Sequence, residues 1–241
     1  MSAQVIDERE RHQRIKARKM LTYLAIFAIV MFFAGLLSAY IVSSTGGYWV
    51  QFTLPEAFIY STVAIVAGSV TVHLALLAAR RGSRQPVVIW LALTLALGLA
   101  FTWSQFNGWQ TLIERGITLN PNWMLKFSGT YGVDHSFMKN QEVLVLENGS
   151  YYMPDDLGHA RPLNAELEDQ RDRTGPYLYA LTGLHLAHLA FGLLAVVVML
   201  VTAARGRYGA EDNVGLWAGA LYWHFLGGLW VFLLLFLSIV H

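Results

Sequence analysis

The chain has 241 residues, of which 55% are hydrophobic and only 14% are charged, with a mean hydropathy of +0.43 and a formal net charge of +1. This composition is too apolar for an ordinary soluble domain. The chain contains no cysteine, which excludes disulfides, thiolate metal sites and iron–sulfur clusters. Its basic residues lie beside apolar segments and not on one soluble face, so the sequence gives no support for a nucleic-acid partner.

Five segments are long enough to cross a membrane and contain no Asp, Glu, Lys or Arg. A bilayer core about 30 Å thick requires roughly 20 apolar residues per helix. The five segments are Met20–Ser43, Ala57–Ala79, Pro86–Leu112, Tyr177–Ala204 and Val214–Val240. We therefore predict an all-α membrane protein, a bundle of five transmembrane helices.

Positive charge sets the expected orientation of these spans. Residues 1–19 contain six Lys or Arg residues, three arginines follow the second span and two follow the fourth. Because short cytoplasmic segments are enriched in Lys and Arg, residues 1–19 are expected in the cytoplasm, with the C-terminus outside. The first span is longer than the apolar part of a signal peptide, so we do not expect cleavage.

The connection between the third and fourth spans, residues 113–176, is the predicted outer loop. It carries ten acidic and six basic residues, a net charge of −4. Within it, Glu142–Leu146 and Ser150–Met153 are β-prone and flank Asn148-Gly149, a pair that suits a type I′ hairpin turn. We expect a small β-hairpin on the outer surface, with a disordered linker as the alternative. The chain is thus expected to consist of a basic cytoplasmic segment (1–19), helices one to three (20–112), the outer loop (113–176), and helices four and five (177–241).

Histidines are the titratable side chains left inside the spans. His185 and His188 are three residues apart in the fourth span, so both rings can face one neighbouring helix, and His224 lies in the fifth span. As haem ligands, two of them would have to meet across one macrocycle, as in a b-type cytochrome. We favour hydrogen bonding within the bundle, because small residues such as Gly192 and Gly228 lie at helical spacing beside them and allow close helix contacts. A membrane scaffold or transport protein remains a further alternative, although the absence of charged residues in the spans argues against transport.

Two motifs in the last two spans resemble a known family. They are Thr182-Gly183-Leu184-His185-Leu186-Ala187-His188 and Tyr222-Trp223-His224-Phe225, the latter followed by Trp230. Both are similar to motifs of the haem-copper oxidase subunit III family, found in cytochrome c oxidases and quinol oxidases. Gly68–His73 and Gln105 fit the same pattern, so the resemblance covers nearly the whole membrane portion.

The resemblance implies an accessory, non-redox subunit III of an aerobic terminal oxidase. Such a subunit stabilises the catalytic subunit I, which reduces dioxygen to water and pumps protons. It implies no catalytic, cofactor or metal residue in this chain, with haem and copper in partner subunits and phospholipid bound at its surface. The implied polar residues of the bundle are His185, His188, His224, Thr182, Gln105 and Trp223.

The implied partners are subunit I, subunit II, other respiratory-complex subunits and membrane lipids, in a bacterial plasma membrane. The acidic outer loop is a candidate contact for cytochrome c, because basic cytochromes are attracted by acidic surfaces. Whether the complex takes electrons from cytochrome c or from quinol stays open, because the donor site lies on other subunits.

Three departures from the family pattern limit what the resemblance implies. The common form has seven helices, and this sequence resembles a shorter form without the first two. The outer loop is longer than usual. Protonatable positions are also replaced, with Ile29 and Gly227 standing where the family has glutamate and aspartate. We therefore expect a structural and lipid-packing role, and not a role in collecting protons.

Overall fold

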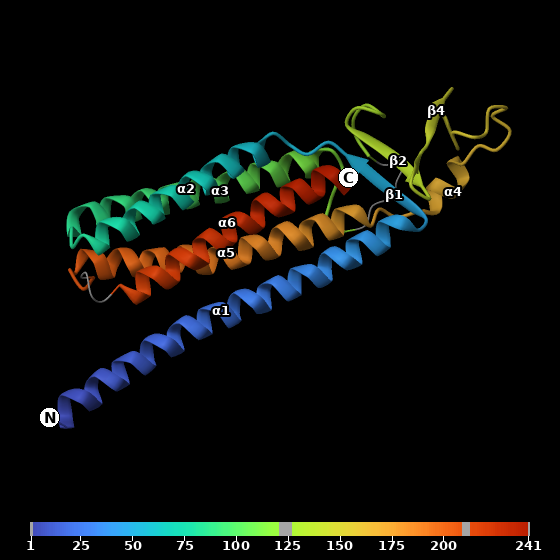
Figure 1. Ribbon diagram of the computed structural model, residues 1–241. Helices are drawn as coiled ribbons and strands as arrows, with labels where there is room; N and C mark the ends of the chain where they lie inside the picture. The colour runs from blue at the N-terminus through green and yellow to red at the C-terminus, as the bar shows by residue number, and fades with distance from the viewer. Residues whose placement is uncertain (1, 121–126, 209–212, 241) are drawn as a thin grey trace. The chain divides into compact units, whose positions relative to one another are not determined.

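Five long helices dominate the computed structural model, which describes residues 2–120, 127–208 and 213–240 (Figure 1). They are α1 (Ser2–Thr45), α2 (Ala57–Arg80), α3 (Arg84–Glu114), α5 (Thr174–Ala204) and α6 (Val214–Val240). Each contains a segment that is long and apolar enough to span a membrane. The predicted fold class, an all-α membrane protein with five spans, is confirmed for these residues. Residue 241, the predicted outer terminus, lies outside the described residues.

Helix α1 begins far before its apolar segment. It has 44 residues, which at 1.5 Å per residue is about 66 Å, roughly twice the thickness of a bilayer core. The charged residues ahead of Met20 continue the helix because Glu, Arg and Lys are good helix formers. A salt bridge one helical turn apart, between Arg14 and Glu10 at 3.5 Å, supports this segment. The apolar pattern alone predicted only the part of α1 that suits lipid.

Helices α2 and α5 end in the same backbone motif. The N–H of Gly82 bonds to the Ala79 carbonyl at 3.0 Å, and the N–H of Gly206 bonds to the Ala203 carbonyl at 2.9 Å. Both glycines adopt left-handed backbone angles, with φ of 71° and 69°. Glycine tolerates this conformation, which closes the last turn of the helix and satisfies its carbonyl groups. The sequence Arg-Gly at both ends therefore marks where these two helices stop.

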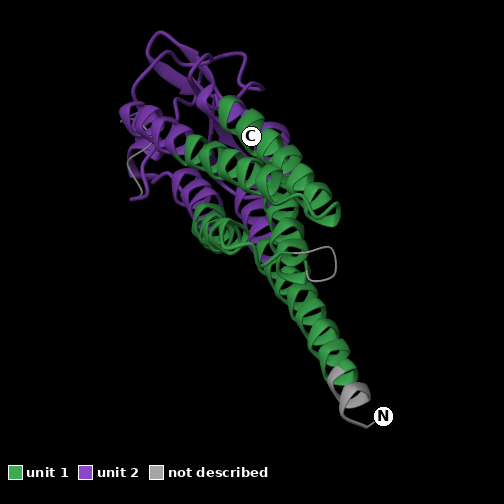
Figure 2. Cartoon of the chain, turned by 90° about the vertical axis from the view of Figure 1, so that its left-hand side faces the viewer, with its two compact units in different colours: residues 1–33, 60–102, 185–231 green, residues 34–59, 103–184, 232–241 purple. Residues whose placement is uncertain are grey.

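The chain divides into two compact units, shown in Figure 2. Unit 1 contains residues 1–33, 60–102 and 185–231, and unit 2 contains residues 34–59, 103–184 and 232–241. The boundaries fall within the long helices, so each helix contributes residues to both units. The described part of unit 1 has no strand, whereas unit 2 contains every strand that the structure describes.

Unit 2 contains an antiparallel three-stranded sheet in the order β1 (Tyr48–Phe52), β2 (His135–Lys139), β3 (Glu142–Val143). Val50 pairs with Phe137 across the first two strands. Strand β1 follows α1 directly and was not predicted from the sequence. A five-residue strand is stable only beside a partner, and here the partner lies in the distant 113–176 segment.

The predicted β-hairpin around Asn148-Gly149 is present, but its first strand is shorter than predicted, because Glu142–Val143 forms β3 of the three-stranded sheet. The hairpin consists of β4 (Val145–Glu147) and β5 (Ser150–Tyr152), which pair antiparallel. At the turn, Asn148 and Gly149 have φ of 50° and 82°, the two positive angles that a type I′ turn requires. A short helix, α4 (Asn164–Asp169), follows the hairpin and was not predicted.

Candidate functional site

The six predicted polar residues lie in different parts of the chain. His185, His188, Trp223 and His224 belong to unit 1, whereas Gln105 and Thr182 belong to unit 2. The candidate site is therefore described first within unit 1, then within unit 2.

His185 is the most enclosed histidine of unit 1, with no exposed surface. Its Nε2 lies 3.1 Å from the carbonyl oxygen of Leu226 on α6. A carbonyl only accepts hydrogen bonds, so Nε2 carries the proton. The imidazole also packs against Phe101 and Trp230, with ring centroids 5.7 and 5.2 Å away. These contacts fix the ring of a residue on α5 between residues of α3 and α6.

His188 and His224 have different neighbours. The ring of His188 lies 5.8 Å from that of Phe33 on α1, and its backbone carbonyl accepts a hydrogen bond of 3.1 Å from Tyr222. The ring of His224 lies 5.8 Å from that of His73 on α2. The rings of the two histidines of α5 thus contact different helices, α3 and α6 for His185 and α1 for His188.

Trp223 fills the space left by two glycines. A Cβ atom on Gly98 would lie 2.6 Å from Trp223 Cη2, and one on Gly68 would lie 3.2 Å from Trp223 Nε1. Glycine is therefore required at position 98 for the fully buried indole to fit. Trp223 was predicted as a residue of the bundle, but these two glycines were not identified as its neighbours.

Hydroxyl groups join the helices of unit 1 at positions that sequence reasoning missed. Thr71 on α2 and Thr94 on α3 share a hydrogen bond of 2.8 Å between their hydroxyl oxygens. The indole N–H of Trp230 donates to the Thr62 hydroxyl at 2.9 Å. Threonine inside an apolar segment was the available signal, because a hydroxyl there needs a partner.

In unit 2, Thr182 bonds within the helices. Its hydroxyl donates to the Leu178 carbonyl at 2.8 Å and accepts from the indole N–H of Trp109 at 3.2 Å. Gln105 is buried, with 1% of its surface exposed. Both residues therefore lie inside the helical part of unit 2, as hydrogen-bonding side chains in a bundle must.

Asp172 is a buried acid that was not singled out from the sequence. Its carboxylate accepts hydrogen bonds from the backbone N–H groups of Thr174 at 2.7 Å and Gly175 at 3.0 Å, which open α5. The Thr174 hydroxyl in turn accepts from the N–H of Val50 in β1, at 3.2 Å. Burial raises the pKa of Asp172, and the two backbone bonds partly oppose that rise. An Asp two residues before Thr-Gly at a helix start was the missed capping signal.

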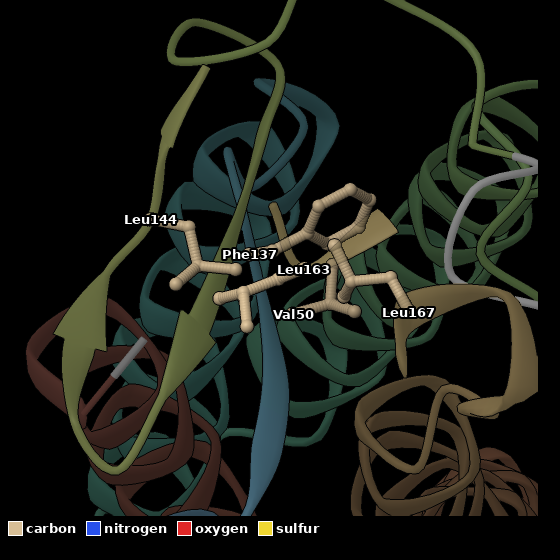
Figure 3. Packing of buried hydrophobic residues seen from close by; sticks show 5 residues of the cluster. All are labelled: Val50, Phe137, Leu144, Leu163 and Leu167. Carbon is tan, nitrogen blue, oxygen red and sulfur yellow. The ribbon is translucent and has the colours of Figure 1, made fainter. Parts of the chain in front are cut away.

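The sheet of unit 2 covers a small apolar core of its own. Figure 3 shows five buried side chains gathered there from β1, β2, the β3–β4 link, the residue before α4 and α4 itself: Val50, Phe137, Leu144, Leu163 and Leu167. Tyr131 packs against this core, and its hydroxyl donates to the Leu144 carbonyl at 2.7 Å and accepts from the Phe137 N–H at 3.2 Å. Burial raises the pKa of Tyr131 to about 12.

A charged group lies at the edge of this core. The Glu166 carboxylate accepts hydrogen bonds from the Lys139 ammonium at 2.6 Å and the Tyr48 hydroxyl at 2.5 Å. Both bonds lower the pKa of Glu166, and the bond from Lys139 has the larger effect. Lys139 and Glu166 also line a hollow of about 600 Å³, together with Met153, Asp155, Asp156, Arg161, Pro162 and Leu163.

The geometry of unit 1 suits packing better than ligation. A haem ligand needs a ring nitrogen that faces the iron, whereas the Nε2 of His185 is bonded to a backbone carbonyl and its ring lies against two aromatic rings. Among the residues that the structure describes, no group of three or more His, Asp or Glu side chains could hold a metal ion.

Comparison with known proteins supports the resemblance. Residues 169–240, which include all of α5 and α6, match the family model described as cytochrome c oxidase subunit III. The chain is 25% identical over 210 residues to cytochrome c oxidase subunit 3 of Corynebacterium diphtheriae, which covers 84% of this chain and 78% of that protein.

Two further relatives are matched over less of their length. Cytochrome c oxidase subunit 3 of Alkalihalophilus pseudofirmus is 24% identical over 71% of this chain and 60% of the relative. Cytochrome bo(3) ubiquinol oxidase subunit 3 of Pseudomonas aeruginosa is 22% identical over 75% of this chain and 62% of the relative. The matched region thus spans less than two thirds of these two relatives.

Proposed function

We propose, from its similarity to the haem-copper oxidase subunit III family, that the chain is an accessory subunit III of an aerobic terminal oxidase. In this role it packs beside subunit I, which reduces dioxygen to water and pumps protons, and it stabilises that subunit. The observation that carries the proposal is the family match over residues 169–240. That segment holds His185 and Trp223, the residues around which unit 1 packs.

The proposed role of the polar residues is structural. His185, Trp230 and the Thr71–Thr94 pair form hydrogen bonds between uncharged groups, and such bonds between membrane helices contribute about 0.6 to 2 kcal/mol each. No Asp, Glu, Lys or Arg occurs from Met20 to Ser43 or in the other four predicted spans. The resemblance implies that haem and copper belong to partner subunits in the proposed complex, while this chain supplies a packing surface and binds phospholipid.

The proposed orientation places residues 1–19 in the cytoplasm and the sheet of unit 2 outside. The support is the distribution of Lys and Arg, with the turn after α2 and the end of α5 on the basic side. A bacterial plasma membrane is the proposed location. Reporter fusions after Arg81 and after Asn148 test the orientation. A reporter that is active only in the cytoplasm should be active after Arg81, and a reporter that is active only outside should be active after Asn148.

A contact between the outer sheet and cytochrome c is a second, narrower proposal. Its support is the net charge of −4 over residues 113–176, because acidic surfaces attract basic cytochromes. Replacing the exposed Glu142, Glu168 and Asp169 by their amides should slow oxidation of a basic cytochrome c at low salt and have little effect at high salt. Amide replacement of Glu8 and Glu10, at the far end of the sequence, is the control.

An affinity purification in mild detergent tests the main proposal. We expect this chain to bring down subunits I and II, with a visible spectrum of haem from the partner subunits. A chain that is purified alone and colourless would contradict the accessory-subunit role and leave a scaffold or transport protein. A Soret band in the isolated chain would instead support the b-type cytochrome alternative.

A further inference from the structure

Two histidines of unit 1 lie side by side in the membrane-spanning part of the chain. His73 on α2 and His224 on α6 have ring centroids 5.8 Å apart. His73 is seven residues before the end of α2, and His224 is ten residues after the start of α6. At 1.5 Å per residue, these positions lie about 10 and 15 Å from the helix ends. Both imidazoles therefore lie within the hydrocarbon core, about 30 Å thick, that these helices span.

The two imidazoles face outward and have no hydrogen-bond partner among the residues that the structure describes. His73 is exposed and His224 is half-buried. Val66 and Val70, seven and three residues before His73, expose 47% and 56% of their surface, so this side of α2 faces away from the bundle. A neutral imidazole has one donor and one acceptor, and lipid satisfies neither. Because polar groups without a partner are costly in a membrane, we expect protein, not lipid, to cover this face.

The helix surface beside the histidines leaves room for a close neighbour. Gly228 is one helical turn after His224 and is exposed, and a Cβ atom there would meet nothing within 4 Å. Glycine on a membrane helix allows the backbone of another helix to approach closely. Ser69, one turn before His73, lies at the contact with α6, with its Oγ 3.0 Å from the position of a Cβ atom on Gly227. This face therefore combines polar side chains with space for a helix.

The chemistry of the two imidazoles indicates which group the neighbour carries. A single side chain that satisfies both rings needs two polar atoms. A carboxyl group has two oxygens that accept hydrogen bonds and, when protonated, one O–H that donates. The five predicted spans of this chain contain no Asp or Glu. The carboxyl group that fits must therefore come from another membrane protein.

We propose that the face of α2 and α6 around His73, His224 and Gly228 is a docking surface for a transmembrane helix of a partner protein, which places an Asp or Glu carboxyl group between the two imidazoles. The partner helix packs on Gly228, and its carboxyl group bonds to a ring nitrogen of each histidine. In the proposed complex the partner is another oxidase subunit, so the inference rests on the proposed function for the identity of the partner. It adds the surface that makes the contact and the group that the partner carries.

Photo-crosslinking in intact membranes tests what covers this face. The photoreactive amino acid benzoylphenylalanine replaces Val70, one helical turn before His73 and 56% exposed. The same replacement of Leu194 on α5, which is 59% exposed, is the control. We expect position 70 to capture a peptide of a partner membrane helix that contains Asp or Glu, at least tenfold more often than position 194 captures it. Capture of lipid alone, of a second copy of this chain, or of a helix without an acid would overturn the proposal.

Paired variants test the hydrogen bonds themselves. Leucine removes the polar atoms of histidine, whereas glutamine keeps a donor and an acceptor. In the complex purified in mild detergent, His73→Leu/His224→Leu should lower recovery of the acid-bearing partner at least fivefold. His73→Gln/His224→Gln should keep at least half of the wild-type recovery. Equal recovery with the leucine and glutamine pairs would overturn the proposal, because shape alone would then account for the contact.

The same samples separate the docking surface from the oxidase role. Capture of an acid-bearing helix from a membrane protein that is not an oxidase subunit would support the docking surface and contradict the proposed function. Recovery of oxidase subunits I and II with the wild-type chain, together with capture of lipid alone at position 70, would support the proposed function and overturn the docking surface.

Discussion

Trp223 in the helical part of unit 1 and Phe137 in the sheet of unit 2 are both large aromatic residues that are buried. Their surroundings differ. Trp223 lies against Gly68 and Gly98, in a region whose helices are joined by bonds between uncharged groups. Phe137 lies among aliphatic side chains and aromatic rings, in a region whose edge carries charged and titratable groups.

This difference reflects the solvent that each region meets. Between helices in lipid, contact of apolar side chains gains little, so close fit and hydrogen bonds hold the helices together. In water, burial of apolar area stabilises a sheet by roughly 25 cal/mol per Å². The two regions should therefore respond to different perturbations. The helical part of unit 1 should respond to added volume at glycine, and the sheet of unit 2 should respond to loss of apolar area or to a change in pH.

Removal of the Phe137 ring should have the largest effect, confined to the sheet. Phe137→Ala is expected to destabilise the sheet region by about 3–5 kcal/mol, because it removes the central side chain of a small core. Trypsin cleavage at Lys139 and Arg161 should become at least a hundredfold faster, while the helical circular dichroism is retained. Leu157→Ala is the control, since Leu157 is 90% exposed. Unchanged protection would show that the core does not hold the sheet.

Addition of volume at Gly98 should have the next largest effect, confined to the bundle. Gly98→Val is expected to cost about 1–3 kcal/mol, because its Cβ would lie 2.6 Å from both Leu193 and Trp223. This loss of stability is measured by unfolding the protein in mixed micelles with increasing sodium dodecyl sulfate and following its circular dichroism. Gly228→Val should unfold as the wild type does, because nothing lies within 4 Å of a Cβ there. Equal effects at both glycines would show that close fit to Trp223 is not what stabilises the bundle.

Loss of the His185 hydrogen bond should have a smaller effect. His185→Leu is expected to destabilise the bundle by about 1 kcal/mol, the usual size for a bond between membrane helices. The same unfolding assay applies. His73→Leu makes the same chemical change at an exposed position and should have almost no effect. A loss several times larger would point to a role for His185 beyond this bond.

A fall in pH should produce the smallest effect, again in the sheet alone. Burial lowers the pKa of His135, and the nearby Asp134 carboxylate partly opposes that shift. The unfolded state therefore binds a proton first, so stability is full above the unfolded pKa of about 6.5 and falls as pH drops through the folded pKa. Trypsin protection of the sheet should decrease between pH 7.5 and pH 5.

Two variants separate His135 from its surroundings in the pH experiment. His135→Phe should remove the decrease in protection, because phenylalanine fits among the rings of Phe127 and Phe137 and does not titrate. His159→Gln removes an exposed histidine that pairs with Glu147 at 2.9 Å. If this variant abolished the pH dependence and His135→Phe did not, the buried histidine would not be its source.

The spans and the hairpin could be predicted because their signals are local. Lipid excludes charged residues, so each charge-free run marks a helix, and the pair Asn148-Gly149 suits one kind of turn. The pairing of β1 with β2 left no such signal, because neither strand shows which distant segment it contacts. The helical start of α1 was missed because polar residues form helices without an apolar pattern.

The candidate site was predictable to a similar degree. Histidines beside small residues in a charge-free span pointed to His185, but its acceptor is the backbone carbonyl of Leu226, and a carbonyl is present at every position. The need for glycine at position 98 depends on how α3, α5 and α6 are placed along one another. That placement arises only in the folded chain.

The pairing of β1 with β2 also sets an order of events during synthesis. Thr53, next to β1, bonds to Val133, and the two are 80 residues apart in the sequence. At a translation rate of roughly 5–20 residues per second, β1 waits about 4 to 16 s for its partner. During that interval α2 and α3 enter the membrane while β1 stays unpaired. The sheet therefore closes only after the third helix has been synthesised, so a nascent chain stalled before that point lacks the β1–β2 pair.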